Sequence, residues 1–304
     1  MSEAVPTEIE GRVVRLSNLD KVLYPSVGFT KAEVIDYYAR IAPVMLGHLA
    51  GRCVTFRRFP DGVEGESFFE KRCASHRPDW VRTAKGPGDR RGRIDYCLIE
   101  DTPTLVWAAN LAALELHTPM ARADEPDNPT MVVFDLDPGA PAGIAECAQV
   151  ALEIREVLGG LDLELVPKSS GSKGLQLYLP LNGSGTAAHD TEHARSFALA
   201  TAQLLAKRLP ALVVTEQTKA ARTGKVLIDW SQNADYKTTV CAYSLRARPE
   251  PTVSTPVRWE EVADAANGTE LSFVSSEVLE RVEAHGDLFA PALELTQRLP
   301  TPRS

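Results

Sequence analysis

The 304-residue sequence has no long hydrophobic run, and its first residues do not resemble a secretory signal. Hydrophobic residues make up 44% of the chain, yet no stretch approaches the roughly 18 uninterrupted apolar residues of a membrane-spanning helix. The opening residues, MSEAVPTEIEGRVVRL, also lack the basic-then-apolar layout of a secretory signal. We therefore expect a globular cytoplasmic protein with a substantial core and no membrane contact.

Closely spaced cysteines are missing as well. The five cysteines are scattered, and no two of them form a Cys-x-x-Cys pair: Cys53, Cys73, Cys97, Cys147 and Cys241. An odd number with this spacing favours reduced thiols over a disulfide framework or a structural zinc site.

An overall positive charge, which would favour nucleic-acid binding, is also absent, because the formal net charge is −8. The charges are segregated, however. Residues 51–93 and residues 165–250 each carry a net +5, whereas residues 95–164 carry −12. The basic segments could line a groove for nucleic acid while the acidic segment holds divalent cations, or all three could be solvated faces.

Short strand-like runs alternate with helical ones along the chain. Runs rich in β-branched and aromatic residues predict strands at 53–59, 131–137, 175–181 and 225–231. Apolar periodicity and capping residues predict helices at 31–49, 103–116, 143–158, 190–209 and 275–283, the first with Thr30 as its N-cap. This pattern indicates an α/β or α+β protein.

The run MVVFDLDPG contains two aspartates, Asp135 and Asp137, on a predicted strand that is otherwise apolar. Residues two apart on a strand point to the same face, about 7 Å apart along it. Buried like charges are unfavourable unless they are paired or bind a cation. Pro138 and Gly139 end the strand, which places both carboxylates at its carboxyl-terminal edge.

A third carboxylate, Asp229, ends the strand-like run KVLID. Three aspartates from two strand ends would form an all-oxygen site suited to two Mg²⁺ or Mn²⁺ ions, which can promote an in-line phosphoryl displacement. A D-x-D pair alone is weak evidence, because Asp135 and Asp137 could instead be turn or capping residues before the helix that starts near Gly143.

The segment KSSGSKG, residues 168–174, is a Gly/Ser loop with two lysines directly before the predicted strand 175–181. Backbone N–H groups, hydroxyls and a lysine in such a loop can hold phosphate oxygens, although a polar hairpin turn explains the loop alone equally well. It lacks Walker A spacing. Beside metal-binding aspartates, a triphosphate-holding loop favours a polymerase over a hydrolase.

Ordered motifs along nearly the whole chain resemble the polymerase domain of bacterial ATP-dependent DNA ligase D, a member of the archaeo-eukaryotic primase superfamily used in non-homologous end joining. The motifs are LSNLDKVLYP (16–25), GFTKAEVIDYY (28–38), FFEKR (68–72), AALELH (112–117), VVFDLDPG (132–139), SSGSKGLQLYLPL (169–181), IDWSQN (228–233) and YSLRARP (243–249). That many ordered motifs are unlikely by chance, so the chain is identified as a member of this family or a stand-alone relative.

The resemblance implies an α+β fold, with a primase-polymerase catalytic core of β-sheets flanked by helices. A single primase-polymerase domain would cover residues 1–304. Its N-terminal, DNA-contacting part would span about 1–120, its catalytic core about 121–250 and its C-terminal helical segment about 251–304.

The resemblance also implies roles for individual residues. The catalytic ligands of two Mn²⁺ or Mg²⁺ ions would be Asp135, Asp137 and Asp229. The residues expected to bind the incoming nucleotide are His117, Ser170, Lys173, Gln232 and Arg246. For His117 the ordinary alternative is a satisfied histidine at a helix end.

The implied DNA-binding residues are Asn18, Lys21, Lys31, Arg58, Phe68, Phe69 and Lys71. The first three would hold a downstream 5′-phosphate, although two lysines ten residues apart are surface charges in most proteins. The two phenylalanines would stack on the template, with basic neighbours for its phosphates. Because neighbours on a strand face opposite ways, one of them could instead be core. The basic loop 85–93 matches a mobile family element that meets DNA ends.

The implied function is metal-dependent, template-directed addition of NTPs or dNTPs to a primer 3′-OH, in DNA gaps or at broken ends. The family suggests Ku as a partner and a nucleoid-associated location in the cytoplasm. The alternatives are a two-metal nuclease or phosphoesterase, and a non-catalytic DNA-end-binding module. No ligase or phosphoesterase motifs are seen, so we expect an excised domain or a stand-alone relative, the latter suited to short-gap filling or primer synthesis.

Overall fold

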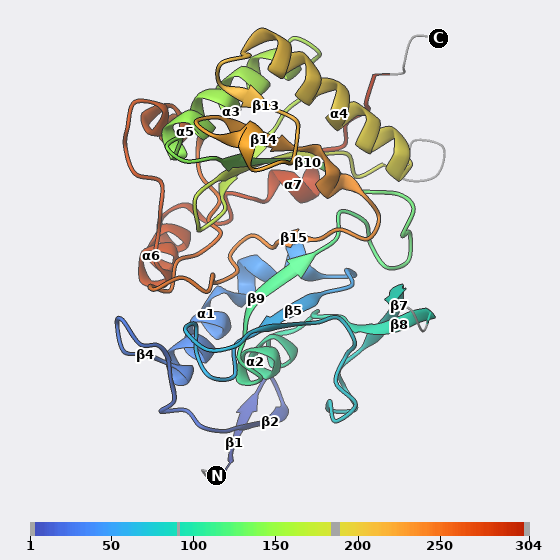
Figure 1. Cartoon of the computed structure of the whole chain (residues 1–304). Helices are drawn as coiled ribbons and strands as arrows, with labels where there is room; N and C mark the ends of the chain where they lie inside the picture. Colours follow the sequence, from blue (N-terminus) through green and yellow to red (C-terminus); the bar gives the residue numbers. More distant parts are fainter. Residues whose placement is uncertain (1–3, 90–91, 184–188, 301–304) are drawn as a thin grey trace. The chain divides into compact units, whose positions relative to one another are not determined.

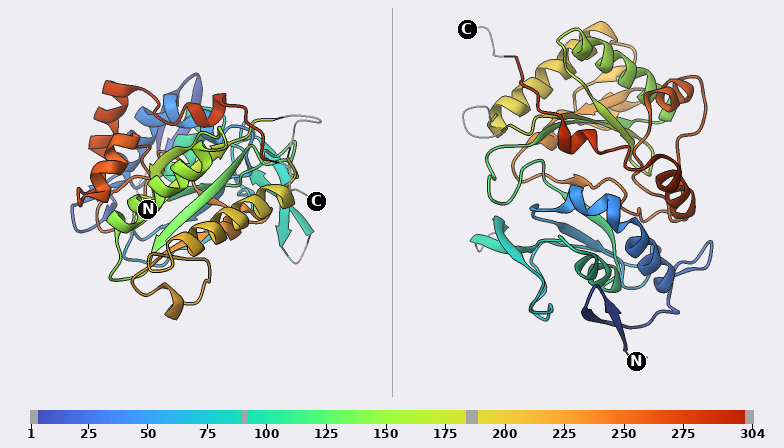
Figure 2. Two further views of the ribbon diagram at one scale, coloured as in Figure 1. Left: turned by 90° about the horizontal axis from the view of Figure 1, so that it is seen from above. Right: turned by 180° about the vertical axis from the view of Figure 1, so that it is seen from behind.

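The computed structural model describes residues 4–89, 92–183 and 189–300, which form two compact units (Figure 1, Figure 2). Unit 1 consists of Met1–Pro119, Thr238–Ser254 and Phe273–Asp287. Unit 2 consists of Met120–Lys237, Thr255–Ser272 and Leu288–Ser304. Each unit therefore combines segments that are far apart in the sequence. The predicted α+β fold class is confirmed.

Unit 1 is built on a four-stranded antiparallel sheet. Its strand order is β15 (Thr239–Val240), β9 (Ala113–Thr118), β5 (Thr55–Arg58) and β6 (Phe68–Glu70). Its helices are α1 (Lys31–Leu49), α2 (Thr102–Asn110) and α6 (Ser275–His285). Two-stranded sheets join β1 (Val5–Ile9) to β2 (Arg12–Leu16), β3 (Val22–Tyr24) to β4 (Phe29–Thr30) and β7 (Thr83–Asp89) to β8 (Gly92–Cys97).

Helix α1 begins and ends where the sequence predicts. Thr30 accepts a hydrogen bond from the Glu33 backbone N–H, and the Glu33 carboxylate accepts one from the Thr30 backbone N–H, which forms a capping box. Buried residues then recur every three or four positions and direct one face of the helix into the core of unit 1.

Unit 2 is built on a five-stranded sheet in which only the β13–β14 pair is parallel. Its strand order is β11 (Val166–Ser169), β12 (Leu175–Pro180), β10 (Met131–Pro138), β14 (Val226–Asp229) and β13 (Val213–Val214). Helices α3 (Ile144–Gly159) and α4 (Thr191–Arg208) cover one face, and α7 (Pro291–Glu294) lies on the other (Figure 1). The remaining elements are α5 (Trp259–Ala266), η2 (Ala220–Arg222) and η3 (Trp230–Asn233).

The predicted helix 103–116 is wrong in its second half. Helix α2 ends at Asn110, and Ala112 adopts a positive φ of 56°, which redirects the chain into strand β9. Nearly every residue of β9 is buried between β5 and β15, so sheet pairing overrides the helix preference of Ala, Leu and Glu. As a result His117 lies on a strand, and its assignment to a helix end is also wrong.

Two further predictions for unit 1 need correction. The structure pairs Cys73 and Cys97 in a disulfide, whereas the sequence favoured reduced thiols throughout. Cys97 ends β8, and the Cys73 backbone N–H donates to the Asp95 carbonyl, so tertiary packing brings together two cysteines with no sequence spacing signal. The expected loop 85–93 is mainly the paired strands β7 and β8, and Arg90 and Arg91 lie outside the described residues.

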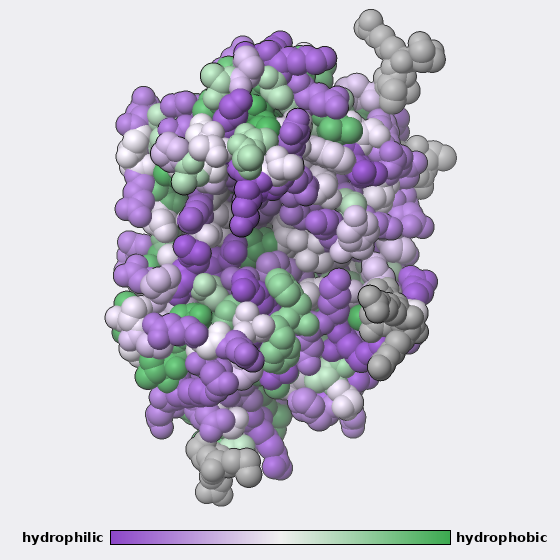
Figure 3. Space-filling model, viewed as in Figure 1, coloured by the Kyte–Doolittle hydropathy of each residue, from purple (hydrophilic) through white to green (hydrophobic). Residues whose placement is uncertain are grey.

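The face of the chain drawn in Figure 3 is mainly polar. No helix in the described part of the chain is long and apolar enough to span a bilayer. Among the exposed apolar side chains, Phe68 and Phe69 of β6 stand out because two neighbouring aromatic rings lie 46% and 59% exposed. Exposed adjacent aromatics are typical of a binding surface.

We expect the strand end after β10 to tolerate no side chain at Gly139. A Cβ there would lie 2.0 Å from the Arg222 carbonyl oxygen, so Gly139→Ala should lower the free energy of unfolding by about 1–3 kcal/mol in urea denaturation. Gly159→Ala is the matched control, because a Cβ at that position meets no atom within 4 Å. It should be neutral or stabilising by about 0.5–1 kcal/mol, and equal losses in both variants would contradict the packing argument.

Candidate active site

The sheet of unit 2 aligns four polar residues directly opposite one another on successive strands. Lys168 of β11 pairs with Gln176 of β12, Gln176 pairs with Asp135 of β10, and Asp135 pairs with Asp229 of β14. We call these four residues the polar row. Directly opposed residues project to the same face of an antiparallel sheet, and Asp137, two positions after Asp135, shares that face. The strand-end placement predicted for the two aspartates of β10 is therefore observed.

Amide and hydroxyl groups surround the oxygens of the aspartates. The Gln176 amide Nε2 donates to Asp135 Oδ1 at 2.9 Å. Asp229 Oδ1 accepts from the Ser231 hydroxyl at 2.6 Å and from Gln217 Nε2 at 3.0 Å, while its Oδ2 accepts from Gln232 Nε2 at 3.0 Å. Gln232 thus lies beside the Asp229 carboxylate, and its contact with the incoming nucleotide stays a prediction.

The three carboxylates, Asp135, Asp137 and Asp229, form a carboxylate cluster whose like charges oppose one another. Burial, together with the charges of Asp137 and then Asp229, raises the pKa of Asp135 to about 7. The hydrogen bond from Gln176 and the positive charge of Lys168 act in the opposite direction but do not cancel the effect. The negative charge of the cluster is therefore only partly compensated.

The carboxylate cluster fits a hard divalent cation in the chemistry of its donors, which are all oxygens. Across residues 4–89, 92–183 and 189–300, however, no three His, Cys, Asp or Glu side chains are arranged as ligands of one ion. In this structure one oxygen of Asp135 and both oxygens of Asp229 accept hydrogen bonds from Gln176, Gln217 and Gln232.

The loop between β11 and β12 lies against the end of β10. The Ser170 hydroxyl oxygen accepts hydrogen bonds from the backbone N–H groups of Ser172 and Gly174, which holds the loop in a tight turn. A Cβ at Gly174 would lie 2.1 Å from the Leu136 carbonyl oxygen, so this close approach requires glycine. The predicted phosphate loop therefore neighbours the strand end that carries Asp135 and Asp137.

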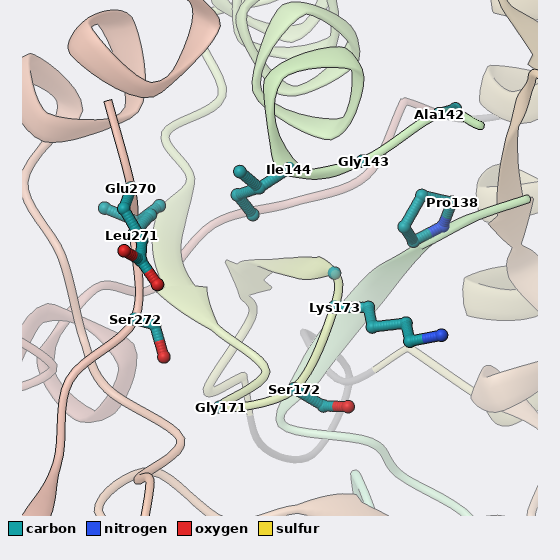
Figure 4. A pocket seen from close by; sticks show the side chains of 11 residues that line it. Pro138, Ala142, Gly143, Ile144, Gly171, Ser172, Lys173, Glu270, Leu271 and Ser272 are labelled. Carbon is teal, nitrogen blue, oxygen red and sulfur yellow. The ribbon is translucent and has the colours of Figure 1, made fainter. Parts of the chain in front are cut away.

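A pocket of about 330 Å³ opens beside this loop, as Figure 4 shows. The loop and the residues after β10 form one side, and residues 270–272 form the other. Lys173 is exposed and its side chain extends away from Glu270 and Leu271 (Figure 4). The ammonium group is therefore accessible to an anionic ligand.

In unit 1, Glu115 organises the predicted nucleotide contacts His117 and Arg246. Glu115 Oε1 accepts from Arg246 Nε at 3.1 Å and from the Ala247 backbone N–H, and its Oε2 lies 3.0 Å from His117 Nε2. Arg57 makes a longer contact with the same carboxylate. Burial opposes ionisation, yet the hydrogen bond from His117 and the charge of Arg246 hold the pKa of Glu115 well below its usual range. Burial also lowers the pKa of His117, which favours a neutral imidazole at pH 7.

Phe68 and Phe69 extend from the same sheet toward solvent. The guanidinium of Arg58 lies 5.3 Å from the ring centroid of Phe68, and that of Arg57 lies 5.4 Å from that of Phe69. The Phe69 ring also meets His117 edge-on at 5.7 Å. Neither phenylalanine is core, so the core alternative for one of them is wrong. A cavity of about 600 Å³ lies beside them and includes Lys71 in its lining.

The structure brings Asn18, Lys21 and Lys31 together at the start of α1. The Lys21 backbone N–H donates to the Asn18 carbonyl, and the Lys31 backbone N–H donates to the Lys21 carbonyl. Burial, followed by the charges of Lys21 and Arg58, lowers the pKa of Lys31 to about 8. Crowded cations at a helix N-terminus favour an anionic ligand, although Asp61 already pairs with Lys21.

Comparison with known proteins decides the family. Residues 30–289 match the family model described as the LigD primase-polymerase domain. The chain belongs to the LigD primase-polymerase family. The predictions of the family and of a primase-polymerase nucleotidyltransferase are thereby confirmed.

Relatives support the assignment over almost the whole chain. The multifunctional non-homologous end joining protein LigD of Mycolicibacterium smegmatis is 45% identical over 281 residues, which cover 91% of this chain and 36% of that protein. The bifunctional LigD of Bacillus subtilis is 32% identical, covering 90% of this chain and 43% of that protein. The chain thus spans less than half the length of these LigD proteins.

A solved structure of the polymerase domain of Mycobacterium tuberculosis ligase D, in complex with DNA, matches the fold. The TM-score is 0.86 at 42% identity, and the match covers 93% of this chain and 99% of that one. The likeness therefore extends over the complete solved domain.

The sequence did not reveal several residues that contact the predicted site of this LigD primase-polymerase domain. They are Glu115, Gln176, Gln217 and Ser231. Lys168 was expected in the phosphate loop, but it is buried on β11 and donates to Gln176, so that part of the prediction is wrong. Glu115 and Gln176 could have been found from strand periodicity, because each lies on a strand face that also carries a site residue. Gln217 follows β13 in a loop and has no such signal.

Without divalent cations, we expect the stability of the protein to depend on repulsion within the carboxylate cluster. Because the pKa of Asp135 is raised on folding, this group favours the folded state at low pH, and that contribution is lost as the pH rises from about 4 through about 7. In EDTA, Asp137→Asn should therefore raise the Tm at pH 8 more than at pH 5. The exposed control Asp127→Asn should change the Tm equally at both pH values. An unchanged Tm for Asp137→Asn at pH 8 would contradict this account.

Proposed function

We propose that the chain extends a primer 3′-OH with NTPs or dNTPs under the direction of a template, in DNA gaps or at broken ends. The observation that carries this proposal is the carboxylate cluster at the end of β10, next to the Ser170–Gly174 loop. Family membership favours this reaction over the nuclease and the non-catalytic module. We further propose that both units belong to a single primase-polymerase domain over residues 1–304.

Asp135, Asp137 and Asp229 are the proposed ligands of two Mn²⁺ or Mg²⁺ ions. When bound, such ions lower the pKa of the attacking hydroxyl and neutralise charge on the phosphates. The amides of Gln176, Gln217 and Gln232 orient the carboxylates and leave their remaining lone pairs for cations. The chain needs no nucleophile of its own, because the primer supplies the hydroxyl.

Each unit carries residues that are proposed contacts of an incoming nucleotide. In unit 2, the hydroxyl of Ser170, the ammonium group of Lys173 and the Gln232 amide provide donors for a triphosphate. In unit 1, Glu115 accepts a hydrogen bond from Arg246 Nε and so fixes the position of a guanidinium group, a group that suits phosphate oxygens. His117 contacts the same carboxylate and the ring of Phe69.

The proposed DNA contacts lie on unit 1. Phe68 and Phe69 expose rings on which template bases can stack, at about 1–3 kcal/mol per base, with Arg58 and Lys71 near them for backbone phosphates. Asn18, Lys21 and Lys31 form the proposed pocket for a downstream 5′-phosphate. The similar Mycobacterium tuberculosis domain was solved in complex with DNA, which supports DNA binding by this chain.

The cellular role that we propose is synthesis during double-strand break repair. The named relatives are non-homologous end joining proteins, which supports an association with the end-joining factor Ku and a nucleoid-associated location in the cytoplasm.

Primer extension with labelled nucleotides and Mn²⁺ tests the proposed reaction. Asp135→Asn should reduce synthesis by about two orders of magnitude or more, because the variant loses one metal-binding charge, while DNA binding stays within about twofold. Asp127→Asn, which removes an exposed charge of unit 2, should retain full activity. Shortened primers would instead indicate a nuclease, and a gel shift without turnover would indicate a binding module.

We expect the preference for gapped DNA with a 5′-phosphate over gapped DNA with a 5′-hydroxyl to depend on pH. Lys31 is charged below its pKa of about 8 and loses its charge above it, so the advantage of a 5′-phosphate over a 5′-hydroxyl on gapped DNA should fall between pH 7 and pH 9. Lys31→Arg should keep the preference at pH 9, and Lys31→Met should lose it at pH 7, as measured by fluorescence anisotropy. A preference that is the same for Lys31→Met and the wild type would refute this assignment.

A further inference from the structure

Lys168 is a buried lysine that has no role in the proposed reaction described above. It stands at one end of the polar row and is only 1% exposed. A buried ammonium group is unfavourable unless polar or charged groups compensate it. Its nitrogen donates to Gln176 Oε1 at 2.5 Å and lies 5.4 Å from the ring centroid of Tyr178. Its compensation thus includes the residue that contacts Asp135.

Lys168 fixes the orientation of the Gln176 amide. An ammonium group can only donate, so it requires the amide oxygen on its own side, and the Tyr178 hydroxyl donates to that same oxygen at 3.2 Å. The amide nitrogen must then face the opposite direction, where it donates to Asp135 Oδ1. If the Gln176 amide were flipped, its oxygen would no longer accept the hydrogen bonds from Lys168 and Tyr178. That oxygen would instead lie against the Asp135 carboxylate, which would repel it.

We propose that Lys168 is a positioning residue for the metal site, acting through Gln176 on Asp135. The inference rests on the proposed metal site at the carboxylate cluster. The hydrogen bond from Gln176 to Asp135 Oδ1 holds the Asp135 side chain in one rotamer. Asp135 Oδ2 is then available to a cation.

A purely structural role for Lys168 makes a different prediction. If the ammonium group only fills space between β11 and β12, an apolar side chain of similar length should replace it with little loss or with a gain in stability. Metal affinity would then be unchanged. Metal affinity measured without DNA or nucleotide therefore separates the two roles.

The experiment measures Mn²⁺ binding to the full chain by isothermal titration calorimetry, with thermal stability recorded for each variant. Lys168→Met should weaken Mn²⁺ binding by about 10- to 100-fold, the usual effect of removing a partner of a metal ligand. Gln176→Met should weaken it to a similar extent. The double variant should lose no more than Gln176→Met alone, because Lys168 acts through Gln176.

Two controls make the outcome decisive. Lys207→Met removes an exposed lysine of α4 and should bind Mn²⁺ like the wild type. Asp135→Asn should strongly reduce Mn²⁺ binding, and if it does not, the proposed metal site itself is wrong.

If Asp135→Asn reduces binding while Lys168→Met stays within about twofold of the wild type, only the inference on Lys168 is overturned. Should Lys168→Met not fold, Lys168→Gln tests the same point. The Lys168→Gln variant keeps a polar group in the buried position. It removes the positive charge, and it replaces an ammonium group, which can only donate hydrogen bonds, with an amide that can donate or accept them. Weaker Mn²⁺ binding by Lys168→Gln supports the inference, and unchanged binding refutes it.

Discussion

The carboxylates of Asp135, Asp137 and Asp229 repel one another on one face of the sheet of unit 2. This repulsion is the constraint on which the rest of unit 2 depends. Antiparallel pairing with β14 sets Asp229 directly opposite Asp135, while the two-residue repeat of the strand adds Asp137 to the same face. Such an arrangement persists only when neighbouring groups supply donors and positive charge. Gln176, Gln217 and Gln232 supply the donors, and a cation is the natural source of the charge.

In unit 1 the charges are arranged the other way round, because basic side chains surround one buried carboxylate. Glu115 binds Arg246 and His117 and lies near Arg57, so its charge is compensated without a metal. The overall charge of −8 therefore says little about partners. What matters is that acidic groups concentrate at the carboxylate cluster while exposed aromatic rings and basic side chains gather on the sheet of unit 1.

Much of the site was accessible from local sequence rules. The position of Asp135 and Asp137 followed from strand periodicity and from the strand-ending Pro138, and helix α1 followed from its apolar periodicity and its N-cap Thr30. Local rules failed at residues 113–116, where burial in the centre of a sheet outweighed helix preference. They also failed for Cys73 and Cys97, because pairing between distant cysteines depends on packing that spacing does not encode.

The sequence by itself determined which chemical groups the protein has and where its main strands and helices lie, because periodicity, caps and strand-ending residues act locally. Only the tertiary structure decided which groups meet. The polar row exists because four strands pair in one register, and a shift by one residue would turn its members to opposite faces. The same is true of Glu115, whose partner Arg246 lies 131 residues away in the chain and reaches it only through the fold of unit 1.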